Sequence, residues 1–227
     1  MAVSSDQLVK ELRKTIPNRL SLKNVVFVCI GTDRSTGDSL GPLVGTYLEA
    51  IGFTNVLGTV DDPVHAMNLE EKLIGIDSKK KIIAIDACLG QVHSVGAYQA
   101  QKGPLKPGAG VNKDLPPVGN YHITGIVNVG GFMEYFVLQN TRLSLVMKMA
   151  REIVHAIMHV LPPLAFNEVA AGNDNDLNDY AEEEGRLRQQ KRFDRMLINN
   201  DPFYPQAYHE QDVKGWVGIN DNEEGET

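Results

Sequence analysis

The chain has 227 residues, a net charge of −7 and a pI near 5.4. Its length suits one ordinary α/β domain, or one domain with a tail. No Lys/Arg cluster stands out from the acidic balance, so binding to nucleic acid through a basic surface is not expected. No apolar run approaches the ~20 residues of a membrane span, and the amphipathic N-terminus lacks the apolar stretch of a signal peptide. We therefore expect a cytoplasmic protein that binds neither nucleic acid nor membrane.

Capping residues and apolar spacing predict the elements in chain order. Ser4 or Ser5 caps a first helix with apolar positions at Leu8, Leu12 and Ile16, and Pro17 ends it. Continuous apolar runs predict strands buried on both faces, as in a parallel sheet covered by helices. The expected order after the first helix is strand 25–30, helix 42–52, strand 55–60, helix 66–74, strand 82–86, edge strand 95–101, surface loop 103–119, strand 121–129 and helix 143–160.

The composition changes after Pro163, where the sequence becomes polar and rich in charge. We expect a single α/β domain over residues 1–163, with its core in residues 24–161. Residues 164–227 are predicted to be a charged C-terminal extension that is partly disordered.

Two predicted strands lead into Gly-rich segments that carry aspartates. Asp33 and Asp38 follow the first strand in GTDRSTGDSLGP, and Asp86 follows the third in IIAIDACLG. Ligands of open α/β sheets bind outside the carboxyl ends of the strands, so these side chains are expected to cluster. Each also has a purely structural interpretation: a turn for Asp33, a helix cap for Asp38 and a cap of the next turn for Asp86. Taken together, Asp38 and Asp86 favour a functional pair that shares a proton or binds a metal.

Histidine and asparagine residues supply further candidates. His122, near the start of the strand over residues 121–129, would complete a three-ligand metal site with the two aspartates. A histidine satisfied by backbone groups is the commoner case. His65, in DDPVHAMN, is a second candidate with a weaker context. Asn128 precedes two glycines and could donate hydrogen bonds to a substrate carbonyl, or simply form an Asx turn. His155 and His159 are interpreted as residues of one helix face.

Nucleophilic catalysis has little support. No G-x-S-x-G segment is present, which argues against a serine hydrolase of the α/β type. Cys29 lies inside an apolar strand, and the apolar flanks of Cys88 give no reason for a lowered thiol pKa. The two cysteines are expected to be small core residues of a reducing compartment, not a disulfide.

Four blocks in order, CIGTDRSTGDSLGP, IIAIDACLG, PGAGVNKDLPPVG and HITGIVNVGGFMEYFVLQNTRLSLVM, resemble the YyaC-type spore proteases of endospore-forming bacteria. More distantly, the pattern is similar to the spore germination protease, whose family relies on two aspartates that match Asp38 and Asp86. It is also similar to the hydrogenase maturation endopeptidases, in which an S-x-H-x-x-G segment matches Asn120 to Gly125 here, with Asn in place of Ser. That alignment implies Asp38, Asp86 and His122 as ligands of a divalent metal ion.

The resemblance implies a three-layer sandwich with a central, mostly parallel sheet, as in hydrogenase maturation endopeptidases. It also implies an endopeptidase of sporulation or germination, with small acid-soluble spore proteins as possible substrates. Asp38 and Asp86 would be catalytic, either as a pair or with a divalent metal ion held together with His122, and Asp33 and Asn128 would position substrate. A non-catalytic binding protein that keeps the fold is the alternative. A homo-oligomer is conceivable through the long helix or the extension.

Overall fold

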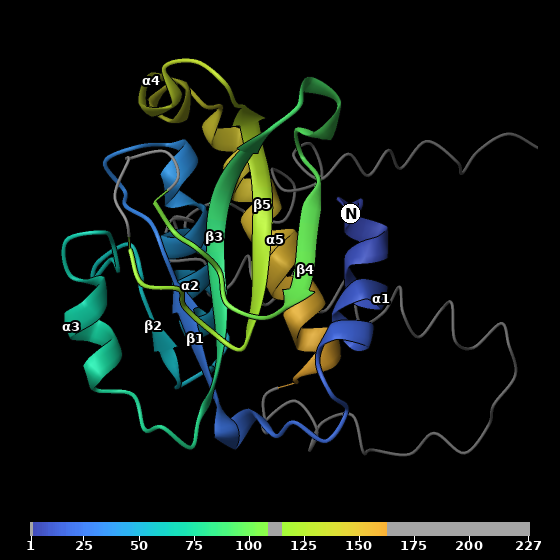
Figure 1. The fold of residues 1–227 in the computed structure, drawn as a ribbon. Helices are drawn as coiled ribbons and strands as arrows, with labels where there is room; N and C mark the ends of the chain where they lie inside the picture. The colour runs from blue at the N-terminus through green and yellow to red at the C-terminus, as the bar shows by residue number, and fades with distance from the viewer. Residues whose placement is uncertain (1, 109–114, 163–227) are drawn as a thin grey trace, which may run out of the picture.

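The computed structural model describes residues 2–108 and 115–162 (Figure 1). Its elements alternate between strands and helices, as expected for an α/β protein. In chain order they are α1 (Ser5–Thr15), η1 (Leu22–Asn24), β1 (Val25–Cys29), η2 (Gly37–Ser39), α2 (Leu40–Ala50), β2 (Val56–Leu57), α3 (Leu69–Ile74), β3 (Lys81–Gly90), η3 (Val92–Ser94), β4 (Tyr98–Lys102), β5 (Tyr121–Val129), α4 (Glu134–Gln139) and α5 (Leu143–Val160), where η marks a short 3-10 helix.

The strands form one sheet of five in the order β2-β1-β3-β5-β4. All neighbours are parallel except β4, which runs antiparallel to β5 at the edge. Every residue of β1 is buried, and the run is apolar throughout because both of its faces are covered. The carboxyl ends of β1, β3 and β5 therefore meet at one edge of the sheet.

Helices and a loop cover the two faces of the sheet (Figure 1). One face packs against α1, α2 and α5, and its core includes Leu8, Phe27, Tyr47 and Ile153. The other face packs against α3 and the loop after β4, with a smaller core that includes Val28, Val64, Leu69, Leu105 and Val118. The expected three-layer α/β architecture with a mixed sheet is confirmed.

Some elements differ from the sequence prediction. β3 continues four residues beyond Asp86, because β5 runs beside it and supplies hydrogen-bond partners as far as the pair Gly90 and Val129. β2 is reduced to two residues, and α4 was not expected. The predicted extension over residues 164–227 and part of the PGAGV segment lie outside the described residues. Within the described ranges, the structure contains no helix of the length and apolarity needed to span a bilayer.

Candidate active site

Asp86 lies inside β3, at the point where β1 ends. Cys29 and Ile85 form the last pair between β1 and β3, so Asp86 is the first residue of β3 beyond β1. On its other side it pairs with Thr124 of β5. The Asp86 side chain is 8% exposed, and its Oδ1 accepts a hydrogen bond of 2.8 Å from the Ala87 N–H. A carboxyl group in such a place is largely cut off from water.

Asp38 lies in η2, on the turn that leaves the end of β1. The Thr32 N–H donates to the Asp38 backbone oxygen at 3.1 Å and closes this turn. Gly31 makes the turn possible: its φ is +142°, and a Cβ there would lie 2.0 Å from the same oxygen. Only glycine fits such an approach. The glycine after β1 therefore brings the half-buried Asp38 back against β3.

The two carboxyl groups interact electrostatically. Burial, followed by the charge of Asp38, raises the pKa of Asp86 well above its ordinary value, while the Ala87 N–H lowers it. Burial also raises the pKa of Asp38, from 3.8 to about 6, against the opposing effects of the Thr32 N–H and of His65. Two buried carboxyl groups that sense each other do not ionise together readily. If the pair carries a single charge, we assign it to the half-buried Asp38 and the proton to the buried Asp86.

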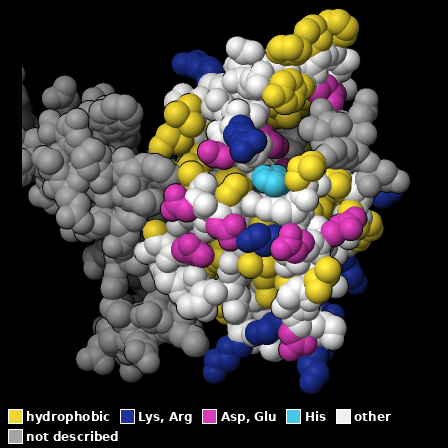
Figure 2. Space-filling view, turned by 90° about the vertical axis from the view of Figure 1, so that its left-hand side faces the viewer, with side chains coloured by type: hydrophobic (Ala, Val, Ile, Leu, Met, Phe, Trp, Pro, Cys, Tyr) yellow, Lys and Arg dark blue, Asp and Glu magenta, His cyan; other side chains and the backbone are white. Residues whose placement is uncertain are grey.

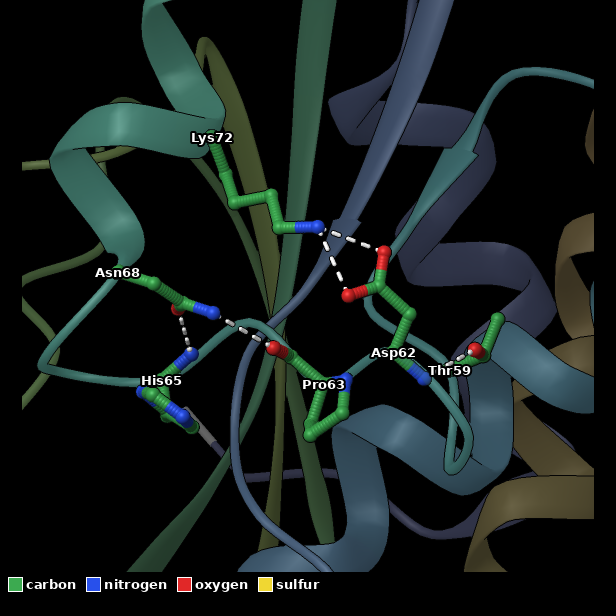
Figure 3. Close-up of polar contacts among 6 residues, drawn as sticks. All are labelled: Thr59, Asp62, Pro63, His65, Asn68 and Lys72. Atoms are coloured by element: carbon green, nitrogen blue, oxygen red, sulfur yellow. Dashed lines mark hydrogen bonds and ion pairs between the residues drawn. The ribbon is translucent and has the colours of Figure 1, made fainter.

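His65 is the histidine whose charge acts on Asp38. It lies on the segment between β2 and α3 that Figure 3 draws, where its backbone N–H donates to Asn68 Oδ1 at 2.8 Å. Its Nδ1 accepts the Met67 N–H at 3.2 Å. Sequence reasoning supported His65 less than His122, and its position soon after the predicted strand 55–60 was the available signal.

The structure does not bring His122 to the aspartate pair. In the register of β3 and β5 it stands opposite Ala84, two residues before Asp86, and its Nδ1 lies 3.0 Å from the Gly103 oxygen. Two strand residues span about 7 Å, directed away from the edge that carries η2. Among residues 2–108 and 115–162, no three His, Cys, Asp or Glu side chains lie close enough to hold a metal ion. The structure therefore does not bring Asp38, Asp86 and His122 together as the expected ligand set. A motif match does not determine the register of β5 against β3, and so does not determine how far His122 lies from Asp86 along the strands.

Asn128 uses its side chain to fix α4. Its Nδ2 donates to the Val137 oxygen at 3.3 Å and to Thr141 Oγ1 at 3.2 Å, and its Oδ1 accepts the Val129 N–H at 2.8 Å. α4 in turn packs on η2: a Cβ at Gly37, beside Asp38, would lie 2.9 Å from Leu138 Cδ2 of α4 and 2.8 Å from Thr141 Oγ1 just after that helix. The bonds of Asn128 thus support the turn that carries Asp38, and its contact with a substrate stays a prediction.

Two further polar residues lie in the turn before Asp38. Asp33 is exposed, and its Oδ1 accepts a bond of 3.4 Å from Thr32 Oγ1. Ser35 is 8% exposed, and no residue of the described chain offers its Oγ a hydrogen bond. A buried hydroxyl without a partner is unusual in native proteins. Sequence reasoning passed over Ser35, since nothing in the pattern distinguishes it from an ordinary turn serine.

Cys88 borders this site, since the charge of Asp86 acts on its thiol, whereas Cys29 belongs to the buried core and His155 and His159 to α5. Both cysteines are free thiols, and burial raises the pKa of each, which makes them poor nucleophiles as expected. His155 and His159 face each other along α5, with their Nε2 atoms 3.1 Å apart. Burial, followed by the charge of His159, lowers the pKa of His155 to about 4.

Apolar side chains are exposed on and before α4. Phe132 is 81% exposed, and Met133, Tyr135 and Phe136 are each more than half exposed. We call these four residues the aromatic surface. Figure 2 shows hydrophobic side chains gathered at the end of the molecule where Figure 1 places α4. Contiguous exposed apolar side chains of this kind are typical of contact sites for other proteins.

Comparisons with known proteins agree with the resemblance to the YyaC type. Residues 1–156 match the family model described as "Protein of unknown function (DUF1256)". The chain is 61% identical over 140 residues to the "Uncharacterized protein YyaC" of Bacillus subtilis (strain 168), a match that covers 60% of this chain and 68% of the relative.

Among solved structures, the chain is similar to the NiFe hydrogenase maturation protease HycI from Thermococcus kodakarensis KOD1. The identity is 16%, the match covers 69% of this chain and 99% of that chain, and the TM-score is 0.44. A likeness at that score supports no conclusion about this chain. The family model and the 61% identical relative are sufficient on their own: the chain belongs to the DUF1256 family.

Proposed function

We propose that this protein is a peptide-bond hydrolase of sporulation or spore germination, with Asp38 and Asp86 as its catalytic groups. The observation that carries the proposal is the pair itself. Asp38 of η2, which packs against β3, and Asp86 of β3 lie beyond the carboxyl end of β1 in the parallel part of the sheet, and the charge of Asp38 raises the pKa of Asp86. The choice of a peptide substrate and of a spore programme rests on the resemblance of the motifs to the germination protease.

The two carboxyl groups have different roles in the proposed hydrolysis, one as general base and the other as general acid. Asp38, ionised and half-buried, takes a proton from a water molecule while the water oxygen bonds to the carbonyl carbon. Asp86, protonated, donates its proton to the amide nitrogen as the C–N bond breaks, which releases an amine and a carboxylic acid. The proton on Asp38 then passes through solvent to Asp86 and restores the starting state. Asp33, exposed at the same turn, is the candidate to hold the substrate backbone.

Small acid-soluble spore proteins are the substrates to test first. We expect the wild type to cleave them, and Asp38→Asn and Asp86→Asn to keep their circular dichroism spectra while losing cleavage at least 100-fold. Asp77→Asn is the matched control, because Asp77 Oδ1 only accepts the Lys79 N–H on an exposed loop. Cleavage at the wild-type rate by either site variant would refute the catalytic pair.

A second candidate function is a non-catalytic binding protein, and the aromatic surface is the observation that favours it. Binding by that surface needs Phe132 and Phe136 but not the carboxyl pair. Calorimetry with the same spore proteins separates the two functions. A wild type that binds without cleaving, an Asp38→Asn/Asp86→Asn double variant that binds equally well, and a Phe132→Ser/Phe136→Ser variant that does not bind would establish the binding role and remove the catalytic one.

A further inference from the structure

Two histidines of α5 face each other across one turn of the helix. His155 and His159 are four residues apart, so both side chains lie on the same side of α5. Their Nε2 atoms are 3.1 Å apart. Their rings meet edge to face, with centroids 4.4 Å apart and an interplanar angle of 85°. The same nitrogen of each imidazole therefore borders the narrow space between the two rings.

The part of α5 that carries the pair is fixed by the core. Ala156 and Ile157, which lie between the two histidines in the sequence, are each 1% exposed and belong to the larger hydrophobic core. The Leu161 N–H donates to the Ile157 oxygen at 2.7 Å and closes the last turn. The two imidazoles themselves are only half-buried. Solvent thus reaches the pair, while the backbone beneath it is held in place before any ligand binds.

The separation of the two nitrogens suits a metal ion between them. Zn²⁺ binds imidazole nitrogen at about 2.0–2.1 Å, so two such bonds place their nitrogens about 2.9 Å apart at a right angle and about 3.3 Å apart at a tetrahedral angle. The 3.1 Å between His155 and His159 lies within that range. Two histidines at i and i+4 on one helix face are also the spacing with which helical zinc motifs bind their metal.

An ion between the rings would replace the hydrogen bond that joins them. In the neutral pair, one Nε2 donates its proton and the other accepts it through its lone pair. For both lone pairs to face an ion, the donor ring moves its proton from Nε2 to Nδ1. Both rings stay neutral in this exchange, and neutral imidazole is the form that binds metals. Binding at this pair therefore releases no net proton from the two rings.

The neighbouring residues indicate a site with two protein ligands. Glu152, one turn before His155, is engaged elsewhere: the Tyr98 hydroxyl donates to its Oε2, and Lys148 Nζ lies 3.8 Å from its Oε1. In the part of the chain that the structure describes, no third His, Cys, Asp or Glu completes a set of ligands. Ala156 stands where the helical motif of zinc proteases carries its catalytic glutamate. The pair is therefore equipped to bind an ion and not to hydrolyse a peptide with it.

We propose that His155 and His159 form a binding site for a late first-row divalent ion such as Zn²⁺ or Cu²⁺, with water in the remaining coordination positions. Imidazole suits these ions, whereas Mg²⁺ and Ca²⁺ prefer oxygen ligands. The ion links two successive turns of α5. It stabilises the folded chain, since a ligand that binds only the folded state raises its stability. The site shares no residue with the aspartate pair and does not depend on the proposed hydrolase function.

The test is calorimetric titration of the untagged full chain with Zn²⁺. We expect His155→Gln and His159→Gln to bind the ion at least about 10-fold more weakly than the wild type, because even the outer-shell partners of a ligand contribute about 10- to 100-fold to affinity. His93→Gln, at an exposed histidine on η3, is the matched control and should bind as the wild type does. Zn²⁺ should raise the melting temperature of the wild type and of this control, but not that of either site variant.

Electron paramagnetic resonance of bound Cu²⁺ identifies the ligands directly. We expect nitrogen couplings from two imidazoles in the wild type and from one in each single variant. The Asp38→Asn/Asp86→Asn variant should keep the ion, which distinguishes this site from a metal at the carboxyl pair. Wild-type Zn²⁺ affinity in a folded His155→Gln or His159→Gln protein, or an ion that is lost only in the aspartate variant, would overturn the proposal.

Discussion

The charge of Asp38 raises the pKa of Asp86, although Asp38 belongs to a turn after β1 and Asp86 to the interior of β3. Burial is the larger cause of the raised pKa in both residues. Ionising this pair therefore costs folding free energy. Such an arrangement is typical of functional sites, which are often less stable than their surroundings allow.

The first prediction concerns the dependence of stability on pH. A carboxyl group whose pKa is higher in the folded protein contributes stability that is fully present below its unfolded pKa and is lost as the pH rises through its folded pKa. For Asp38 this window runs from 3.8 to about 6, and for Asp86 the loss extends further up. At 1.4 kcal/mol per pKa unit, the shift of Asp38 alone corresponds to roughly 3 kcal/mol.

We expect the free energy of unfolding of the wild type to fall as the pH is raised through this window, and Asp86→Asn to fall less. Urea denaturation followed by circular dichroism at a series of pH values measures both slopes. Asp77→Asn should keep the wild-type slope, because its carboxylate is exposed. Identical slopes for Asp86→Asn and the wild type would contradict the raised pKa of Asp86.

The second prediction concerns His122. Its replacement by alanine removes the contact with the Gly103 oxygen and should cost about 1 kcal/mol of stability, without altering divalent-metal binding or cleavage. Elemental analysis and metal calorimetry on the wild type and His122→Ala make the measurement. A stoichiometric ion that is present in the wild type and lost in the variant would restore the metal triad of Asp38, Asp86 and His122.

Much of the fold follows from local sequence. The uninterrupted apolar run of β1 predicts a strand that is buried on both faces. The three- and four-residue spacing of apolar residues in α5 predicts a helix that is buried on one face. The approach of Asp38 and Asp86 is also predictable, since parallel strands share their carboxyl edge. By contrast, α4 exposes Tyr135 and Phe136, so its apolar residues do not form the buried face by which an amphipathic helix is predicted.

The partners of the aspartate pair were beyond local reasoning. Whether His122 or His65 approaches the pair depends on the register of β5 against β3 and on the bridge between Ile30 and Val64. Both are long-range features that no short motif contains. The role of Asn128 depends in the same way on a helix that the sequence did not predict.

The third prediction concerns Asn128. Asn128→Ala removes two donors that fix α4, so we expect a loss of about 1–2 kcal/mol and faster amide exchange in α4 and η2. Asn128→Asp is a useful comparison, since it keeps the oxygen that accepts the Val129 N–H, but it replaces the donor by a carboxylate oxygen that repels the Val137 oxygen, so it should cost at least as much. Hydrogen exchange followed by mass spectrometry provides the measurement. Unchanged exchange combined with a raised KM would favour direct contact with substrate.

The fourth prediction concerns Ser35. Its buried Oγ has no hydrogen-bond partner among the described residues, so Ser35→Ala should leave the free energy of unfolding unchanged or raise it by about 1 kcal/mol. Thermal and urea denaturation test this directly. A loss of more than about 1 kcal/mol would mean that the hydroxyl is bonded in solution. An unchanged stability with weaker substrate binding would indicate that the hydroxyl contacts substrate.

The fifth prediction concerns Gly31, on which the convergence of the site depends. An alanine Cβ would lie 2.0 Å from the Asp38 oxygen, and the φ of +142° is unfavourable for any other residue. We expect Gly31→Ala to destabilise the fold by more than about 3 kcal/mol and to displace the turn of Asp38 from β3. Gly75→Ala is the matched control, because its φ is −75° and nothing lies within 4 Å of its added Cβ.

Chemical denaturation measures the loss of stability in Gly31→Ala. In any folded fraction of that variant, the pKa of the Asp38 carboxyl group should move toward that of an exposed carboxyl group, since burial is the main cause of its raised pKa. Equal stability of the two alanine variants would mean that the turn relaxes without cost and that Gly31 does not position the site.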